Sequence, residues 1–168
     1  MNSAKGEAIE RPPSFHIVLI EPEIPWNTGN VGRTCLAAGA ELHLVGPLGF
    51  SLNQSEVKRA GLDYWEKVRV QQHETWEKFQ ETLSPQAALF FFSTRGEKNL
   101  WEAEFPPEAY LIFGKETAGF PKEFYEKYKN RLYRIPQQEG SVRSLNLSTS
   151  AGIVLFEALR QNQAGRRS

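Results

Sequence analysis

The chain has 168 residues, of which 40% are hydrophobic and 24% are charged, and its 20 basic residues balance 20 acidic ones. These values predict one globular domain with a sizeable core, and the zero net charge argues against nonspecific coating of nucleic acid without excluding a local basic patch. No membrane span or secretory signal is expected, and the single cysteine, Cys35, excludes an internal disulfide framework and indicates a reducing, cytoplasmic compartment.

The first part of the chain predicts a tail, a strand and a helix. Residues 1–13 are polar and are expected to form a mobile tail. Residues 15–21 form a continuous apolar run that is typical of a buried strand. A helix is expected from about Thr28, which could cap it, to Gly39, which could end it. Arg33 lies off the apolar face of this helix, so the core does not explain its presence.

Strands and helices alternate along the rest of the chain. Further strands are predicted at residues 41–46, 67–71, 87–94, 110–113 and 131–135. Further helices are predicted at residues 55–60, 74–83, 121–128 and 146–161. This alternation predicts the α/β class, with a largely parallel sheet and helices on both faces. The final helix has a second apolar stripe, with Ile153 and Phe156, which indicates burial either within the monomer or against a partner subunit.

Three polar loops follow apolar strands, at residues 25–33, 113–121 and 135–148. Ligands bind open α/β sheets at the carboxyl ends of the strands, so these loops predict one composite site. A helix start in the first loop would favour an anion such as phosphate, with Arg33 one turn into the helix. Neither the dinucleotide fingerprint nor a P-loop is present. Each loop taken alone also has a structural explanation, as a capped helix start or an ordinary turn.

No metal is expected from the pattern of possible ligands. The three histidines, His16, His43 and His73, lie far apart in the sequence and lack the spacing of a metal site. They are interpreted as structural or surface residues.

Four segments together resemble the SPOUT superfamily of RNA methyltransferases on its SpoU side, and most closely the TrmL (YibK-like) group. The segments are Glu21-Pro22-Glu23-Ile24-Pro25, Asn27-Thr28-Gly29-Asn30, Arg59-Ala60-Gly61-Leu62-Asp63-Tyr64 and Ser144-Leu145-Asn146-Leu147-Ser148. The resemblance covers residues 15–161. It implies a methyltransferase domain at 14–162 between tails at 1–13 and 163–168. The family also implies a deep trefoil knot in the C-terminal part and a homodimer.

The resemblance implies a cytoplasmic enzyme that uses S-adenosylmethionine, without a metal, to methylate a ribose 2′-hydroxyl of tRNA. The target implied is the wobble nucleotide, cytidine or uridine 34, of tRNA(Leu)-type substrates. Two alternatives stay open, namely 2′-O-methylation at another RNA position and a non-catalytic RNA-binding module on the same fold.

The same resemblance implies roles for residues in the three loops. The catalytic positions are Arg33, Asn27, Glu116, Ser144 and Asn146. The cofactor contacts are Phe92, Thr94, Gly114, Ile135, Ser144 and Leu145. In the related enzymes an arginine at this position is the proposed base. A guanidinium is normally protonated, so Arg33 is expected either to have a special environment or to stabilise the developing alkoxide.

Five basic residues are candidate phosphate contacts: Lys58, Arg59, Arg95, Lys98 and Arg143. The second loop departs from the family pattern at three positions, where Lys115 replaces a proline, Ala118 an arginine and Phe120 a leucine. These changes put the choice of tRNA in more doubt than the reaction class.

Overall fold

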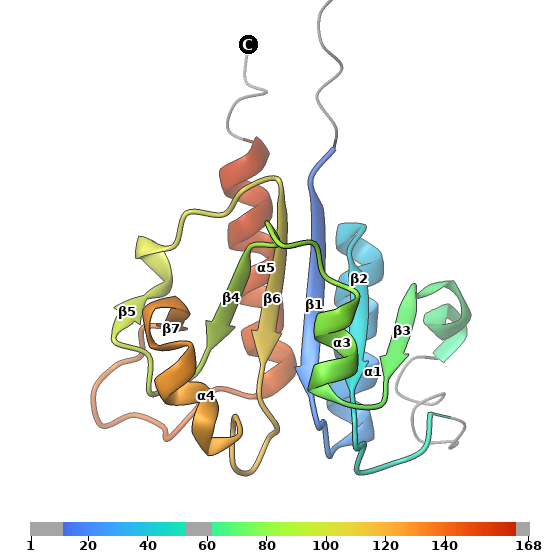
Figure 1. Ribbon diagram of the computed structural model, residues 1–168, viewed down its shortest axis with the longest axis horizontal. Helices are drawn as coiled ribbons and strands as arrows, with labels where there is room; N and C mark the ends of the chain where they lie inside the picture. The colour runs from blue at the N-terminus through green and yellow to red at the C-terminus, as the bar shows by residue number, and fades with distance from the viewer. Residues whose placement is uncertain (1–11, 53–61, 164–168) are drawn as a thin grey trace, which may run out of the picture.

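The computed structural model describes residues 12–52 and 62–163 of the chain. In this part, seven strands form one sheet in the order β3-β2-β1-β6-β4-β7-β5, and every neighbouring pair is parallel (Figure 1). The strands are β1 (Ser14–Ile20), β2 (Glu41–Val45), β3 (Val70–His73), β4 (Leu89–Phe92), β5 (Lys98–Asn99), β6 (Glu108–Phe113) and β7 (Leu132–Arg134). The predicted α/β class with a parallel sheet is therefore confirmed.

Helices cover both faces of this sheet (Figure 1). The α-helices are α1 (Pro25–Ala38), α3 (Trp76–Glu81), α4 (Lys122–Lys127) and α5 (Leu147–Gln163), and the 3₁₀ turns are η1 (Leu62–Lys67), η2 (Leu100–Glu102) and η3 (Lys129–Arg131). The helices α1 and α5 pack together on one face, and α3 and α4 lie on the other. No helix in these residues is long and apolar enough to cross a membrane.

The central strand β1 explains why two layers of helices form. Successive side chains of a strand point to opposite faces of a sheet. Accordingly, Ile17 and Leu19 belong to the core beneath α1 and α5, whereas Val18 and Ile20 belong to the core beneath α3. All four side chains are almost completely buried. A continuous apolar run of this kind stabilises the sheet only if both of its faces are covered.

The expected start of the first helix at Thr28 is wrong. The helix α1 begins at Pro25, three residues earlier, and Thr28 is fully buried inside it. Proline is tolerated in the first turn because its missing N–H would have no partner within the helix. The expected end is confirmed, since Gly39 caps the helix with a φ of 70°, which a residue without a side chain adopts at little cost.

Most other predicted elements are present with shifted ends. The strand predicted at 67–71 lies at Val70–His73, and the helix predicted at 121–128 follows Pro121 and covers Lys122–Lys127. The strand β5 was not predicted, because two residues are too short for an apolar pattern. The helix predicted at 55–60 and most of the tail at 1–13 lie outside the described residues.

On the helix α5, the burial expected for the first apolar stripe is confirmed, whereas the second stripe is partly exposed. Four residues of the first stripe are buried: Ala151, Val154, Leu155 and Ala158. On the second stripe, Ile153 is only partly buried and the side chain of Phe156 is 52% exposed. Among the described residues, Ile153 packs partly against the core, and Phe156 is the member of the second stripe that stays largely uncovered.

Candidate functional site at the carboxyl ends of the strands

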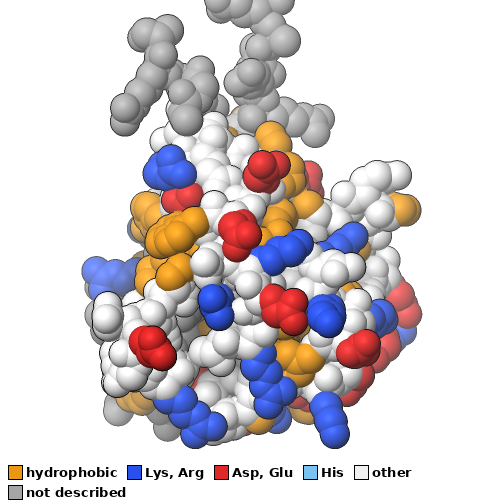
Figure 2. Space-filling model, turned by 90° about the vertical axis from the view of Figure 1, so that its left-hand side faces the viewer, with side chains coloured by type: hydrophobic (Ala, Val, Ile, Leu, Met, Phe, Trp, Pro, Cys, Tyr) orange, Lys and Arg blue, Asp and Glu red, His pale blue; other side chains and the backbone are white. Residues whose placement is uncertain are grey.

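The three polar loops line one cavity of about 410 Å³, as the sequence predicts. The cavity opens where β4, β6 and β7 end, and these strands contribute or precede Phe92, Phe113 and Ile135 at its wall. Several Lys and Arg side chains gather at the lower end of the face seen in Figure 2, which is the end at which the strands of Figure 1 terminate.

Glu116 joins the second loop to the first. Its Oε2 accepts a hydrogen bond of 2.9 Å from the backbone N–H of Glu23, and its Oε1 accepts one of 3.2 Å from that of Ile24. The hydroxyl of Thr117 donates a further bond of 2.9 Å to the carboxylate of Glu23. These donors lie at the entrance to α1, where backbone N–H groups have no partner inside the helix. The carboxylate of Glu116 therefore fixes the position at which the first loop enters its helix.

Asn146 joins the third loop to the first. Its Nδ2 donates to Oδ1 of Asn27 at 3.1 Å. Its own Oδ1 accepts from the backbone N–H of Ser148 at 2.8 Å, which caps the start of α5. One side chain thus links the starts of α1 and α5 beside the cavity.

The backbone of the second loop folds tightly around Gly114. A side chain at this position would place its Cβ only 2.4 Å from the carbonyl carbon of Gly119 and 2.6 Å from the nitrogen of Phe120. Lys115 and Gly119 exchange two backbone hydrogen bonds, of 3.0 and 3.1 Å, and Gly119 has a φ of 72°. A glycine is required at both positions, since Gly114 lies against the backbone of Gly119 and Phe120 and Gly119 has a positive φ.

The structure brings together all of the predicted site residues except one. The cavity is lined by Asn27, Phe92, Thr94, Gly114, Glu116, Ile135, Ser144, Leu145 and Asn146. Arg33 is not among the lining residues, since it is exposed on α1 with its guanidinium 5.4 Å from the centre of the Tyr64 ring. Tyr125 also lines the cavity. The sequence does not single it out, because it belongs to no recognisable motif.

Two of the candidate phosphate contacts, Arg95 and Arg143, line the cavity. The guanidinium of Arg95 lies 4.5 Å from the centre of the Tyr125 ring, a cation–π contact that holds it at the wall. Lys98 instead donates to the backbone carbonyl of Asn130 at 3.0 Å. Lys58 and Arg59 lie outside the described residues.

The three histidines lie far apart in the sequence but side by side in the structure. His16, His43 and His73 stand on β1, β2 and β3, and their rings are joined by two contacts of 3.0 Å. Burial, and after it the neighbouring His16 and His73, lowers the pKa of His43 to about 3. Burial also lowers the pKa of His16, against the opposing effect of Glu41 and Glu108. Pairing of parallel strands, which short-range sequence spacing does not reveal, creates this row.

The family model described as the SpoU rRNA Methylase family matches residues 14–156. The chain belongs to the SpoU methylase family. A SpoU relative from Burkholderia ambifaria, named tRNA (cytidine(34)-2′-O)-methyltransferase, is 44% identical over 149 residues, which cover 88% of this chain and 95% of the relative. A Synechocystis protein, named putative tRNA (cytidine(34)-2′-O)-methyltransferase, is 47% identical over 146 residues, or 86% of this chain and 95% of the relative.

Solved SpoU structures share the fold. One, from a study of "the 2-OH methylation of C/U34 on tRNA", has a TM-score of 0.86 and 46% identity, and the match covers 91% of this chain and 99% of that one. Another, described as an AdoMet-bound rRNA methyltransferase from Sinorhizobium meliloti, has a TM-score of 0.78 and 28% identity, and the match covers 89% of this chain and 57% of that one.

The cavity of this SpoU chain suits a nucleoside that carries a charged tail. Its volume lies in the range of sites that enclose small organic ligands. Apolar side chains of Phe92, Ile135 and Leu145 offer a surface for a base, and the tight backbone at Gly114 offers N–H and carbonyl groups. These features fit S-adenosylmethionine, which has an adenine ring and a tail that carries sulfonium, ammonium and carboxylate groups.

Proposed function

We propose that this chain transfers a methyl group from S-adenosylmethionine to the ribose 2′-hydroxyl of nucleotide 34, a cytidine or uridine, in tRNA(Leu)-type substrates. The observation that supports this most is that one cavity gathers nine of the ten predicted site residues, which come from three separate loops. The names of relatives at 44% and 47% identity give the same reaction and position.

The reaction requires the ribose 2′-oxygen to form a bond to the methyl carbon as the bond from that carbon to sulfur breaks, while the hydroxyl proton is released to solvent. When bound, S-adenosylmethionine supplies a methyl group that is already activated for transfer. We propose that Phe92, Thr94, Gly114, Ile135, Ser144 and Leu145 hold this cofactor. In our proposal Asn27, Glu116, Ser144 and Asn146 orient the ribose, since Glu116 and Asn146 are themselves fixed by hydrogen bonds to the first loop and to α5. Preorganised polar groups of this kind stabilise charge that develops during reaction.

Arg33 has a role in this scheme only if a second subunit is present. It lies outside the cavity of its own chain, while α1 and α5 expose apolar side chains that include Leu36 and Phe156. We propose a homodimer that covers these side chains and brings Arg33 to a site completed by both subunits. There the guanidinium stabilises the alkoxide that forms as the 2′-hydroxyl reacts.

A mixed dimer tests the position of Arg33. Co-expression of Arg33→Ala subunits with Asn146→Ala subunits restores one working site per mixed dimer if the arginine serves its partner's cavity. Activity that stays at the level of the two single variants would place Arg33 in its own subunit, and a monomer in solution would refute the dimer.

In our proposal the RNA passes beside the cavity. A second hollow of about 480 Å³ shares Thr94, Ile135, Gln137 and Arg143 with the first and adds Arg134 and Asn99. Arg134 donates from Nε to Oδ1 of Asn99 at 2.9 Å, which fixes one cation at its rim. Arginines at such a rim suit the phosphates of a nucleic acid.

The family also carries a topology that we propose for this chain. In our proposal the C-terminal part of the chain threads a deep trefoil knot. Residues 14–162 form the methyltransferase domain, with tails at 1–13 and 163–168, and the enzyme works in the cytoplasm, where its tRNA substrate is found.

Transfer of labelled methyl groups tests the function. Purified protein with S-adenosylmethionine is expected to label tRNA(Leu), and mass mapping is expected to place the 2′-O-methyl group on nucleotide 34. The matched control is the same tRNA with 2′-deoxyribose at nucleotide 34, which offers no hydroxyl and should remain unlabelled. Cofactor binding without label on any RNA would refute the proposal and favour an RNA-binding module, whose RNA affinity should be unchanged in Arg33→Ala.

A further inference from the structure

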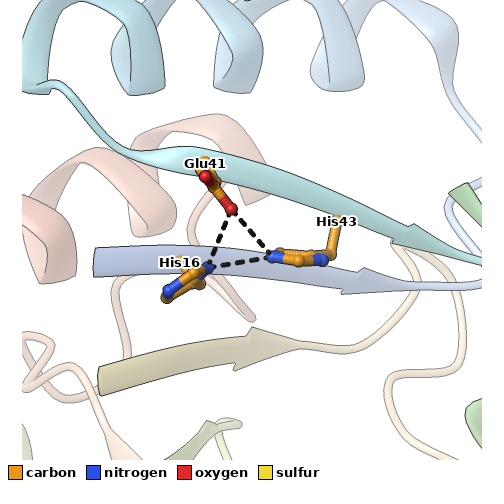
Figure 3. A group of neighbouring side chains, drawn as sticks. All are labelled: His16, Glu41 and His43. Carbon is orange, nitrogen blue, oxygen red and sulfur yellow. Dashed lines mark hydrogen bonds and ion pairs between the residues drawn. The ribbon is translucent and has the colours of Figure 1, made fainter. Parts of the chain in front are cut away.

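We propose that His16, Glu41 and His43 form a binding site for Zn²⁺ on the sheet, apart from the methyltransferase cavity. The three side chains come from β1 and β2 and point toward one another (Figure 3). His16 lies near the amino end of β1, whereas the cavity opens beyond the carboxyl ends of the strands. The site is therefore independent of the proposed function.

The register of two parallel strands brings the three ligands together. His16 pairs directly with Glu41, the first residue of β2, and both side chains point to the same face. His43 follows Glu41 by two residues and so shares that face. The helix α3 covers one side of the cluster, where Phe79 meets the ring of His43 edge-on at 5.4 Å.

The spacing of the donor atoms suits a tetrahedral metal ion. Nδ1 of His16 lies 3.0 Å from Nε2 of His43 and 3.3 Å from Oε2 of Glu41, and the last two atoms are 3.8 Å apart. Ligands of tetrahedral Zn²⁺, at bond lengths of about 2.0–2.1 Å, stand about 3.3–3.4 Å from one another. Small rotations of the side chains convert the observed triangle into that geometry.

The remaining ring nitrogens have the partners that ligand histidines usually require. When Nε2 of His43 binds a metal, its Nδ1–H can donate to Nε2 of His73, which lies at 3.0 Å. When Nδ1 of His16 binds, its proton resides on Nε2, which faces the carboxylate of Glu108 at 3.9 Å. Such outer contacts fix the tautomer and the orientation of metal-bound histidines.

The carboxylate of Glu41 is both held and accessible. Arg69 contacts its Oε1 at 3.4 Å, and Gln71 donates to its Oε2 at 3.5 Å. Its side chain is 24% exposed, whereas those of His16 and His43 are 10% and 5% exposed. An ion can thus approach over Glu41, and a water molecule can occupy the fourth position.

Two imidazoles and one carboxylate select the kind of metal. Imidazole is a ligand for Zn²⁺ and similar transition ions, whereas Mg²⁺ and Ca²⁺ prefer oxygen ligands throughout. In the proposed state the ion links β1 to β2 and, through His73, to β3. Binding to the folded chain alone would then stabilise it in proportion to the concentration of free ion.

Titration with Zn²⁺ and Co²⁺ tests the site on the full chain, purified without a histidine tag and treated with a chelator. We expect one ion per chain, and the visible absorption of tetrahedral Co²⁺. His16→Asn and Glu41→Gln should weaken Zn²⁺ binding by about 100-fold or more, and His73→Gln by about tenfold. The control Glu81→Gln removes an exposed carboxylate on α3 that pairs with Lys78, and should leave the affinity unchanged.

Nitrogen NMR of the imidazoles locates the ion directly, because the chain has only three histidines. Zn²⁺ should shift Nδ1 of His16 and Nε2 of His43. Glu41 is partly exposed, so Glu41→Gln should still fold. The proposal would be overturned if this variant bound Zn²⁺ as tightly as the parent. It would also be overturned if several ions bound without a specific shift of these imidazole nitrogens. Neither measurement involves S-adenosylmethionine or RNA. A negative result would therefore refute the Zn²⁺ site without bearing on the methyltransferase function.

Discussion

Asn146 and Asn27 stand 119 positions apart in the chain, yet Nδ2 of Asn146 donates a hydrogen bond of 3.1 Å to Oδ1 of Asn27. The bond joins the first turns of α1 and α5 at the cavity, and Asn27 is only 7% exposed. Oδ1 of Asn27 is therefore largely screened from water. Loss of its hydrogen bond would leave a buried acceptor unpaired, which lowers the free energy of unfolding. The pair is a structural connection as well as a proposed part of the catalytic site.

A double-mutant cycle measures this connection. Asn146→Ala should lower the free energy of unfolding by about 1–2 kcal/mol, because it removes the cap of α5 together with the bond to Asn27. The cycle with Asn27→Ala should give a coupling of about 1 kcal/mol, read from urea denaturation. The control pair of Asn146→Ala with Thr82→Ala, at the end of α3 on the other face, should be additive. Additivity in both pairs would contradict the bond.

Glu116→Gln tests whether a carboxylate is needed to hold the first loop. The side chain keeps its size. In the parent, two backbone N–H groups donate to the two carboxylate oxygens, whereas in the variant one of them must face the NH₂ of the amide, which cannot accept. We expect the free energy of unfolding to fall by about 1–3 kcal/mol, since charged acceptors form the stronger hydrogen bonds. Methyl transfer should fall as well. Glu126→Gln on the exposed side of α4 is the matched control, and equal behaviour of the two variants would refute the role.

The sequence was sufficient for the longer strands of the sheet and for most of the predicted residues that line the cavity. Apolar runs located β1, β2, β4 and β6, because their side chains are buried on both faces. The polar loops that follow such strands indicated the cavity, since parallel strands bring their carboxyl ends to one edge. Both predictions depend on short stretches of sequence, the apolar runs and the polar loops that follow them, whose positions in a parallel sheet can be inferred locally.

The features that the sequence missed depend on contacts between distant segments. Thr28 looks like a cap, but Pro25 starts the helix earlier and Thr28 is buried, with no hydrogen-bond partner for its hydroxyl among the described residues. The contact between His16 and His43 arises from the register of β1 on β2. Arg33 was placed in the catalytic set by the resemblance, and no local pattern shows that its guanidinium lies over the Tyr64 ring.

Gly114→Ala is expected to disrupt the cofactor cavity. The added methyl group would meet backbone atoms of Gly119 and Phe120 at 2.4 and 2.6 Å, and backbone can yield only if the loop moves. The free energy of unfolding should fall by about 1–3 kcal/mol, and binding of S-adenosylmethionine, measured by calorimetry, should weaken.

Gly152→Ala is the matched control for that substitution. Its Cβ would meet only the methyl group of Thr34, at 3.9 Å, which is an ordinary contact. Alanine also favours a helix over glycine, so this variant should be as stable as the parent or more stable, by about 1 kcal/mol at most. Loss of cofactor binding in both variants would show that the effect of Gly114→Ala is not local.

The histidine row predicts that the metal-free protein becomes less stable in mild acid. In the folded chain the pKa of His43 is about 3, because of burial and of His16 and His73 beside it, whereas an unfolded histidine titrates near 6.5. As the pH falls below 6.5, the unfolded chain therefore takes up a proton that the folded chain refuses, and this equilibrium favours unfolding. Above pH 6.5 this contribution is constant.

Urea denaturation between pH 8 and pH 4.5, with a chelator present, measures the effect. One such group lowers the free energy of unfolding by about 1.4 kcal/mol per pH unit below 6.5. His43→Gln should make this slope shallower, whatever its stability at pH 8, while His16 and His73, whose pKa values burial also lowers, keep part of it. The other groups that face the row, which are Glu41, Glu108, Arg69 and Tyr110, are the same in both proteins. Parallel slopes for the parent and the variant would mean that His43 accepts a proton in the folded chain, and so is less shielded from water than its burial indicates.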